Sequence, residues 1–222
     1  MPEEFLIVID GPAGAGKSTA ARSLARRLGY RYLDTGATYR VVALKAKERG
    51  IGPEMTGELQ ELCSQIDIRF QDVEGGQRVY SDGKDVTEAI RSPEMSMLAS
   101  RISQEKVVRN TMLRLQRRLG GRGVVGEGRD LGTAVFPWAE FKFYLDAAPE
   151  ERGRRKHKDL LAKGLCPTLD EVIEETIRRD QDDQSREIAP LRMAQGAIYV
   201  DSTSLTAEQV VDRMAKEIAK RR

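Results

Sequence analysis

Histidine and cysteine are scarce in this 222-residue chain. The single histidine, His157, excludes any mechanism that needs two, such as that of a metal-dependent hydrolase built on an H-E-x-x-H helix. The two cysteines, Cys63 and Cys166, are far apart in the sequence and form neither a metal-binding nor a redox spacing. We interpret them as reduced thiols without a catalytic role.

Long apolar runs and a large charge of one sign are also absent. No apolar run approaches 18 residues, so we expect no membrane-spanning segment. The N-terminus carries acids before a short apolar stretch, unlike a signal peptide, and we expect a cytoplasmic protein. A net charge of +2 argues against nucleic acid as the main partner. With 40% hydrophobic and 32% charged residues, the chain is expected to form a globular domain with a substantial core.

A glycine-rich loop follows the apolar run at residues 5–10 and precedes a helical pattern. It matches G-x-x-x-x-G-K-[ST], the phosphate-binding P-loop. Its glycines allow a tight turn that points consecutive N–H groups at phosphate oxygens, and Lys17 is expected to reach the β- and γ-phosphates. The Ser18 hydroxyl is the predicted ligand of Mg²⁺. The predicted nucleotide-binding residues are Gly11, Pro12, Ala13, Gly14, Ala15, Gly16, Lys17, Ser18 and Thr19. The chain is therefore predicted to bind a nucleoside triphosphate.

Short apolar runs alternate with helical patterns along the chain, which indicates an α/β fold with a parallel sheet. The predicted strands cover residues 5–9, 31–33, 123–126, 141–145 and 197–200. The predicted helices cover residues 18–28, 36–49, 94–119, 150–163, 169–184 and 206–220.

Residues 64–92 interrupt this alternation. Residues 66–70 have a strict period of two, residues 74–77 form a turn signal, and Asp82-Gly83 is a strong hairpin signal. We expect a small three-stranded antiparallel sheet inserted into the α/β core. Such an insert can be inert, but its position before the third core strand favours a substrate cover.

Basic residues gather in several segments that a phosphate ligand would explain. Arg40 lies near a predicted helix start after the second strand. Arg129 lies in a glycine-flanked loop beyond a predicted strand, where ligand contact is favoured over a local ion pair with its neighbouring aspartate. Residues 150–158 hold five basic residues within seven, which fits a solvated helix face, a nucleic-acid patch or, beside a P-loop, a mobile lid. Residues 178–186 alone would suggest an exposed helix with ion pairs. Together these segments indicate a second anionic substrate, because guanidinium groups bind phosphate oxygens bidentately.

Several motifs together resemble bacterial cytidylate kinases, a family of P-loop nucleoside monophosphate kinases. The matching segments are I-D-G-P-A-G-A-G-K-S at 9–18, L-D-T-G-A-T-Y-R at 33–40, G-R-D-L-G-T at 128–133, F-P at 136–137, R-E-I-A-P-L at 186–191 and V-D-S-T at 200–203. The resemblance covers nearly the whole chain. The P-loop is common to a superfamily, whereas the second and third motifs are far more specific.

The resemblance implies an adenylate-kinase-like fold with a five-stranded parallel sheet flanked by helices. It implies one P-loop kinase domain over residues 1–222, with a β-flap at about 64–92 that binds the nucleoside monophosphate and an arginine-rich lid at about 150–166. The implied reaction transfers the γ-phosphoryl group of ATP, with Mg²⁺, to CMP or dCMP in pyrimidine nucleotide metabolism. Its partners would be these small molecules, and we expect a monomer.

By matching positions, the resemblance also implies the residues of the site. Those implied for the acceptor phosphate are Thr35, Arg40, Arg129 and Arg186. Those implied for cytosine are Ser100, Arg109 and Asp130, and those for the sugar are Arg179 and Asp183. The residues expected to take part in catalysis are Lys17, Arg129, Arg152 and Arg155. Cytosine offers an amino donor to a carboxylate, whereas the carbonyl of uracil would leave that carboxylate unpaired.

Two positions depart from the usual family pattern. Thr35 stands where serine is common and keeps the hydroxyl, while Glu127 replaces an aspartate and is left outside the predicted site because its reach differs. Two alternatives remain open: a monophosphate kinase that prefers UMP or AMP, and a P-loop switch or ATPase that binds RNA through basic segments such as residues 220–222.

Overall fold

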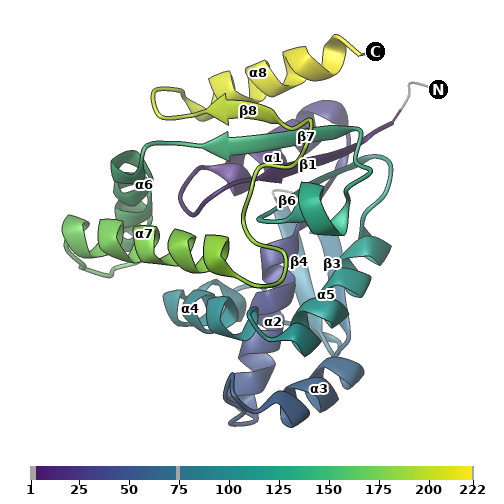
Figure 1. Ribbon diagram of the computed structural model, residues 1–222, viewed down its shortest axis with the longest axis vertical. Coiled ribbons are helices and arrows are strands. Elements are labelled where there is room, and N and C mark those ends of the chain that lie inside the picture. Colours follow the sequence, from purple (N-terminus) through teal and green to yellow (C-terminus); the bar gives the residue numbers. More distant parts are fainter. Residues whose placement is uncertain (1–3, 74–75, 222) are drawn as a thin grey trace. The chain divides into compact units, whose positions relative to one another are not determined.

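The computed structural model describes residues 4–73 and 76–221 of the chain (Figure 1). It divides into two compact units, the first formed by Met1–Arg31 and Arg122–Arg222 and the second by Tyr32–Gly121. Part of the turn predicted at residues 74–77 and the last of the basic residues at 220–222 lie outside the described residues.

A five-stranded sheet with the strand order β2-β6-β1-β7-β8 contributes four of its strands to the first unit, whereas residues 32–34 of β2 belong to the second. Its strands are β1 (Leu6–Asp10), β2 (Arg31–Asp34), β6 (Val124–Gly128), β7 (Phe141–Asp146) and β8 (Ile198–Asp201). The central strand β1 pairs in parallel with β6 and β7, and β7 pairs in parallel with β8. All five residues of β1 are buried, as expected for a central parallel strand covered on both faces. The predicted α/β class with a parallel sheet is confirmed.

The register of the sheet decides which loops meet. Asp10, the last residue of β1, lies opposite Gly128 at the end of β6 and opposite Tyr144 in β7. The P-loop and the loop after β6 therefore leave the same edge of the sheet, outside the carboxyl ends of the strands, which is where ligands bind in open α/β sheets.

The described part of the first unit also forms the α-helices α1 (Lys17–Leu28), α6 (Pro149–Ala162), α7 (Leu169–Ser185) and α8 (Ala207–Ala219). α1 packs against β6 and α8, while α6 and α7 pack against each other and lie side by side (Figure 1). A capping box at the start of α7 is formed by Thr168 and Glu171.

The second unit contains the small antiparallel sheet that the sequence predicts. Its strands β3 (Ile68–Val73), β4 (Gly76–Ser81) and β5 (Lys84–Asp85) follow one another in the order β3-β4-β5. Asp82 and Gly83 form the second turn with φ of 50° and 78°, the left-handed conformation that this dipeptide favours.

Helices α2 (Thr35–Glu48), α3 (Thr56–Gln65), α4 (Pro93–Ile102) and α5 (Lys106–Leu119) surround the core of this unit. α2 packs against α4 and α5, and α3 packs against α5. Buried aliphatic side chains from all four helices form one cluster that also includes residues of β3 and β4. The second unit therefore has a hydrophobic core of its own.

The prediction of one continuous helix over residues 94–119 is wrong, because the chain breaks between α4 and α5. The N–H groups of Gln104 and Glu105 bond to carbonyls only three residues back, at 3.1 Å each, and Glu105 has extended backbone angles. The carbonyl oxygen of Ser103 accepts a hydrogen bond from Arg109 instead of an α-helical N–H. Helix α3 was not predicted; Met55, which precedes its first residue, forms no side-chain cap, the usual signal of a helix start.

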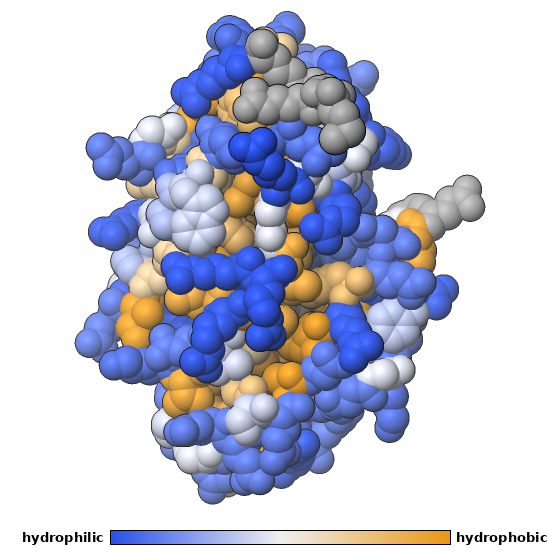
Figure 2. Space-filling view, turned by 90° about the vertical axis from the view of Figure 1, so that its right-hand side faces the viewer, coloured by the Kyte–Doolittle hydropathy of each residue, from blue (hydrophilic) through white to orange (hydrophobic). Residues whose placement is uncertain are grey.

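None of the helices within the described ranges combines the length and apolar character needed to cross a membrane. On the face drawn in Figure 2, hydrophilic side chains predominate and hydrophobic ones show between them.

Candidate active site

Three glycines with positive φ shape the P-loop between β1 and α1. The φ values of Gly11, Gly14 and Gly16 are 148°, 74° and 91°. A Cβ on Gly11 would lie 1.9 Å from the carbonyl oxygen of Leu145, and one on Gly14 would lie 2.7 Å from that of Arg152. Because a side chain at either position would collide with backbone, the loop requires glycine there.

Lys17 is buried at the start of α1, and its ammonium donates a hydrogen bond of 2.6 Å to the Pro12 carbonyl oxygen. Burial lowers the pKa of Lys17 to about 7, and the charge of Arg129 acts in the same direction. The carboxylates of Glu127 and Asp180 oppose this shift. A triphosphate in the loop would add negative charge and favour the ammonium form.

Ser18 follows Lys17, and its hydroxyl donates a hydrogen bond of 2.5 Å to Oε1 of Glu127. Glu127 belongs to β6 and is buried. A hydroxyl and a carboxylate oxygen are ligands that Mg²⁺ prefers, so this pair fits a magnesium site. Within residues 4–73 and 76–221, no cluster of three or more histidine, cysteine or acidic side chains could hold a metal ion alone. The remaining ligands would therefore come from water and phosphate oxygens.

The side chain of Asp10 hydrogen-bonds to the backbone of the loop that follows β6. Its Oδ1 accepts the N–H of Leu131 at 2.9 Å, and its Oδ2 accepts the N–H of Gly132 at 2.7 Å. These two residues begin a single π-helical turn directly after Arg129 and Asp130. The carboxylate that ends β1 thus holds the backbone next to two of the predicted substrate-binding residues.

Three predicted acceptor-site residues of the first unit contact one another. Nε of Arg129 donates a hydrogen bond of 2.9 Å to Oδ2 of Asp183, and Arg186 forms an ion pair with Oδ1. Burial alone would raise the pKa of Asp183, but Arg129, Arg186 and Arg179 outweigh it and hold the pKa below its usual value. The structure therefore brings together the arginine of the β6 loop and the charged residues near the end of α7.

Arg152, predicted as a lid arginine, is buried beside the P-loop. Its Nε donates to the Ala147 carbonyl oxygen at 2.9 Å, and its Nη1 donates to that of Ala13 at 3.1 Å. The same guanidinium forms an ion pair with Asp180 of α7. Its predicted role at the migrating phosphoryl group stays a prediction.

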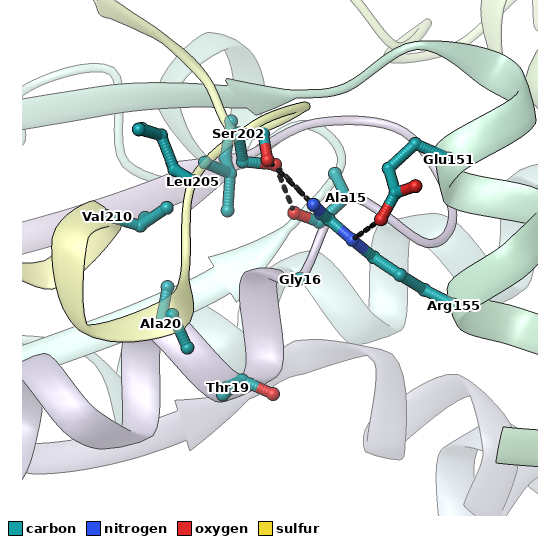
Figure 3. A pocket seen from close by; sticks show the side chains of 11 residues that line it. Ala15, Gly16, Thr19, Ala20, Glu151, Arg155, Ser202, Leu205 and Val210 are labelled. Atoms are coloured by element: carbon teal, nitrogen blue, oxygen red, sulfur yellow. Dashed lines mark hydrogen bonds and ion pairs between the residues drawn. The ribbon is translucent and has the colours of Figure 1, made fainter. Parts of the chain in front are cut away.

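Arg155 lies on the same helix and contacts the segment after β8. Its Nη2 donates to the Ser202 carbonyl oxygen at 2.7 Å and its Nη1 to the Ser202 hydroxyl at 3.0 Å, while its Nε pairs with Glu151 at 3.0 Å (Figure 3). The Ser202 hydroxyl also lies 3.2 Å from the carbonyl oxygen of Ala15 in the P-loop. Arg155 thus bridges α6 to a residue that contacts the P-loop.

These contacts form one wall of a cavity of about 270 Å³ next to the P-loop (Figure 3). Gly16 and Thr19 line it from the side of α1, Arg155 from α6, and Ser202 and Val210 from the C-terminal part of the chain. The lining combines apolar side chains with hydrogen-bonding groups, as small-molecule sites do.

The other two residues predicted for the acceptor phosphate, Thr35 and Arg40, belong to the second unit, where Thr35 opens α2. The Asp34 carboxylate caps this helix, accepting the Ala37 N–H at 3.0 Å, and pairs with Arg40 at 2.7 Å. The helix start thus carries a hydroxyl and a guanidinium, both suited to an anion.

Gln116 of α5 is buried against this helix start. Its amide nitrogen donates to the hydroxyl of Thr38 at 2.9 Å, and that hydroxyl donates to the Thr35 carbonyl oxygen at 2.7 Å. Gln116 therefore fixes the first turn of α2 from the neighbouring helix.

Arg109 is also on α5 and is buried, with its guanidinium carbon 5.6 Å from the centre of the Tyr39 ring. Its Nη1 donates to the Ser103 carbonyl oxygen at 3.1 Å. Ser100 is half-buried on α4. Stacking against Tyr39 places Arg109 next to α2, which also carries Arg40.

The sequence interpretation missed several residues with contacts to these predicted sites. Glu127 was set aside because of its length, yet it reaches Ser18. Ser202 lies in a matched motif without an assigned role, and Gln116 is spaced two helical turns from Arg109. Asp10 directly precedes the first P-loop glycine, which was the signal available for it.

A glycine-shaped P-loop with a buried lysine, at the carboxyl edge of a parallel sheet, defines a P-loop nucleotide-binding protein. Residues 7–220 match the family described as Cytidylate kinase. The chain belongs to this family, as the resemblance of its motifs predicted.

Two relatives that carry the family's name agree with this assignment. The cytidylate kinase of Geobacter sulfurreducens is 51% identical over 218 residues, which cover 98% of this chain and 94% of that protein. The cytidylate kinase of Syntrophotalea carbinolica is 48% identical over 222 residues, covering 100% of this chain and 94% of the relative. Among solved structures, a gluconokinase from Sinorhizobium meliloti has a TM-score of 0.49 at 14% identity, covering 99% of this chain and 94% of that one.

Proposed function

We propose that this protein transfers the γ-phosphoryl group of ATP to CMP or dCMP, giving ADP and CDP or dCDP. The observation that supports this most is that one unit contains both a P-loop with the buried Lys17 and a cluster in which Arg129 and Arg186 contact Asp183. Residues 7–220, which include these arginines, match the cytidylate kinase family.

The donor would bind at the P-loop. The loop N–H groups and Lys17 hold the phosphates of ATP, with the dipole of α1 directed at them. The cavity between Thr19, Arg155 and Ser202 is the candidate site for the donor base, because it adjoins the P-loop and exceeds a purine in volume.

Mg²⁺ would be held by Ser18 with support from Glu127, which their hydrogen bond favours. When bound, the ion neutralises charge on the transferring phosphates. The longer side chain of glutamate compared with aspartate does not prevent contact with Ser18, so Glu127 joins the proposed site.

The acceptor phosphate would be held by Thr35, Arg40, Arg129 and Arg186. Ser100, Arg109 and Asp130 would recognise cytosine, and Arg179 and Asp183 would contact the sugar. A carboxylate at Asp130 favours the amino group of cytosine over the carbonyl of uracil, which would leave it unpaired. The antiparallel sheet of the second unit would serve as the cover over the monophosphate.

We propose direct in-line transfer without a covalent enzyme intermediate. The acceptor oxygen is already anionic, so little help from a general base is needed. Lys17 and Arg129, with Arg152 and Arg155 from the lid, would neutralise the migrating group. Positioning and electrostatics would supply most of the rate.

The proposed partners are small-molecule nucleotides only, and the proposed setting is a cytoplasmic monomer. A switch or ATPase that binds RNA is the alternative from another class, supported only by the basic segments. RNA affinity that falls steeply with salt would favour that alternative.

The test is an assay of ADP release with ATP, Mg²⁺ and a panel of CMP, dCMP, UMP, AMP and GMP. Strong turnover with CMP and dCMP alone supports the proposal and the cytosine-recognising residues. Equal use of UMP would keep the kinase but reject Asp130 as the discriminator. ADP release that does not depend on a monophosphate would reject the kinase.

A further inference from the structure

Asp180 of α7 is a buried carboxylate that contacts the P-loop but belongs to none of the proposed substrate sites. Its Oδ1 accepts the Ala13 N–H at 2.9 Å, and its Oδ2 pairs with Arg152. Arg152 in turn donates to the Ala13 carbonyl oxygen at 3.1 Å. Side chains from two helices thus hold both backbone polar groups of Ala13.

Stability alone explains this ion pair poorly. Both side chains are buried, 8% exposed for Arg152 and 7% for Asp180, and the loss of hydration offsets much of the attraction in such pairs. The pair instead fixes the orientation of the loop backbone, because its hydrogen bonds hold the peptide groups on both sides of Ala13. A third hydrogen bond, from Arg152 to Ala147, ties the guanidinium to the backbone that precedes α6.

The P-loop needs such support because its own backbone is adaptable. Gly11 and Gly14, two positions before Ala13 and one after it, adopt positive φ. Glycine has more conformational freedom than any other residue, so the loop does not keep one conformation by itself. The Pro12 carbonyl oxygen accepts a hydrogen bond from Lys17 of the P-loop itself. The backbone of Ala13 is held instead by Asp180 and Arg152, which belong to α7 and α6.

We propose that Asp180 is a positioning residue that, together with Arg152, presets the P-loop for the donor triphosphate. This inference rests on the proposed function, since it requires donor phosphates in the loop. Preset N–H groups bind an anion without first losing the entropy of a mobile loop. Loss of Asp180 should therefore weaken binding of the phosphoryl donor far more than binding of the acceptor.

The kinetic test compares Asp180→Asn with Asp182→Asn, a matched change at an exposed position of the same helix. For Asp180→Asn we expect the KM for ATP to rise about tenfold or more, because a charged hydrogen-bond acceptor is lost. The KM for CMP should stay within about twofold, and Asp182→Asn should match the wild type. Equal increases in both KM values, or no increase in either, would overturn the proposal.

Hydrogen exchange of the unliganded protein tests the loop without any turnover. We expect Asp180→Asn to speed exchange in residues 11–19 while the strands β1 and β7 keep wild-type rates. Uniformly faster exchange would indicate a structural role only and reject positioning. If the wild type failed to phosphorylate CMP, the proposed function would fall, whereas this measurement would still decide whether Asp180 orders the loop.

Asp180→Asn leaves the buried Arg152 with Asp146, 3.7 Å away, as its remaining acidic partner, and the variant can fail to fold. The double variant Asp180→Leu with Arg152→Met removes both charges and is expected to fold, since apolar residues replace such pairs well. Its unliganded P-loop should still exchange faster than that of the wild type. Wild-type exchange in this variant would show that the pair does not position the loop.

Discussion

Asp10 carries a carboxyl group in a buried position directly before the P-loop. Burial raises the pKa of Asp10 to about 7; hydrogen bonds from the N–H groups of Gly132 and Leu131 lower it only in part, and the charge of Asp130 adds to the rise. The ordinary value is 3.8, so between pH 4 and 7 the folded protein holds a proton that the unfolded chain has lost. The free energy of unfolding should therefore fall as pH rises through this window.

We predict that Asp10→Asn removes this pH dependence. For each pH unit between about 4 and 7, the free energy of unfolding of the wild type should fall by up to about 1.4 kcal/mol. That of the variant should not show this fall, because asparagine cannot ionise. Urea unfolding of both proteins at pH 5, 6, 7 and 8 measures the difference. Parallel stability curves for the two proteins would show that Asp10 keeps its ordinary pKa.

Asp183 connects two of the proposed phosphate-binding arginines, so its loss should affect the acceptor. We predict that Asp183→Asn raises the KM for CMP by about tenfold to a hundredfold, as expected when a charged hydrogen bond is lost, and leaves the KM for ATP within about twofold. Steady-state kinetics with each substrate varied in turn measures both values. Equal damage to both substrates would contradict an acceptor role for Asp183.

At the scale of single residues, the sequence predicts the site residues that belong to one continuous motif. The P-loop and its lysine are readable because their spacing is local. The pairing of Arg129 with Asp183 is not readable, because 54 positions separate them and only the fold brings them together. The same holds for Arg152 and Asp180, which are 28 positions apart. In both pairs, side chains that were expected to contact substrate or solvent contact each other.

At the scale of elements, Gly153 controls how closely α6 and α7 approach. A Cβ at this position would lie 2.3 Å from Cγ1 of Ile173 and 3.2 Å from its Cα. Replacing glycine by alanine in an exposed helix stabilises it by about 1 kcal/mol, but here overpacking should outweigh that gain. We predict that Gly153→Ala lowers the free energy of unfolding by about 1–3 kcal/mol, measured by urea denaturation.

Gly57→Ala is the matched control for this change. Gly57 is also helical, in α3, and a Cβ there would meet nothing within 4 Å. The control should be neutral or more stable than the wild type by up to about 1 kcal/mol. A Gly153 variant as stable as the control would mean that α6 and α7 separate without cost.

The parallel strands were predictable because each is a short buried apolar run, and the Asp82-Gly83 hairpin because its turn has specific residues. The break inside residues 94–119 was not predictable, since the helical pattern continues through it. The hydrogen bond from Arg109 to the Ser103 carbonyl oxygen, made across the break, satisfies one acceptor at that end of α4. The strand order, which brings Ser202 to the P-loop, also has no local signal.

At the scale of the whole molecule, the proposed donor and acceptor residues are distributed differently over the two units. The P-loop and the cavity beside it belong entirely to the first unit. Among the proposed acceptor residues, Arg129 and Arg186 belong to the first unit, whereas Arg40 and Arg109 belong to the second. Nucleotides that bind these two sets should therefore leave different protection patterns.

We predict that ADP slows amide hydrogen exchange in the first unit alone, at residues 11–19 and 202–210, because it fills only the donor site. CMP should slow exchange in both units, at residues 35–40 and at residues 129–131, because bound ligand suppresses local opening wherever it makes contacts. Mass spectrometry of peptides from each unit measures both patterns, and Arg40→Ala should remove the CMP effect from both units together. If CMP protected only one unit, the acceptor residues proposed in the other would have no part in binding it.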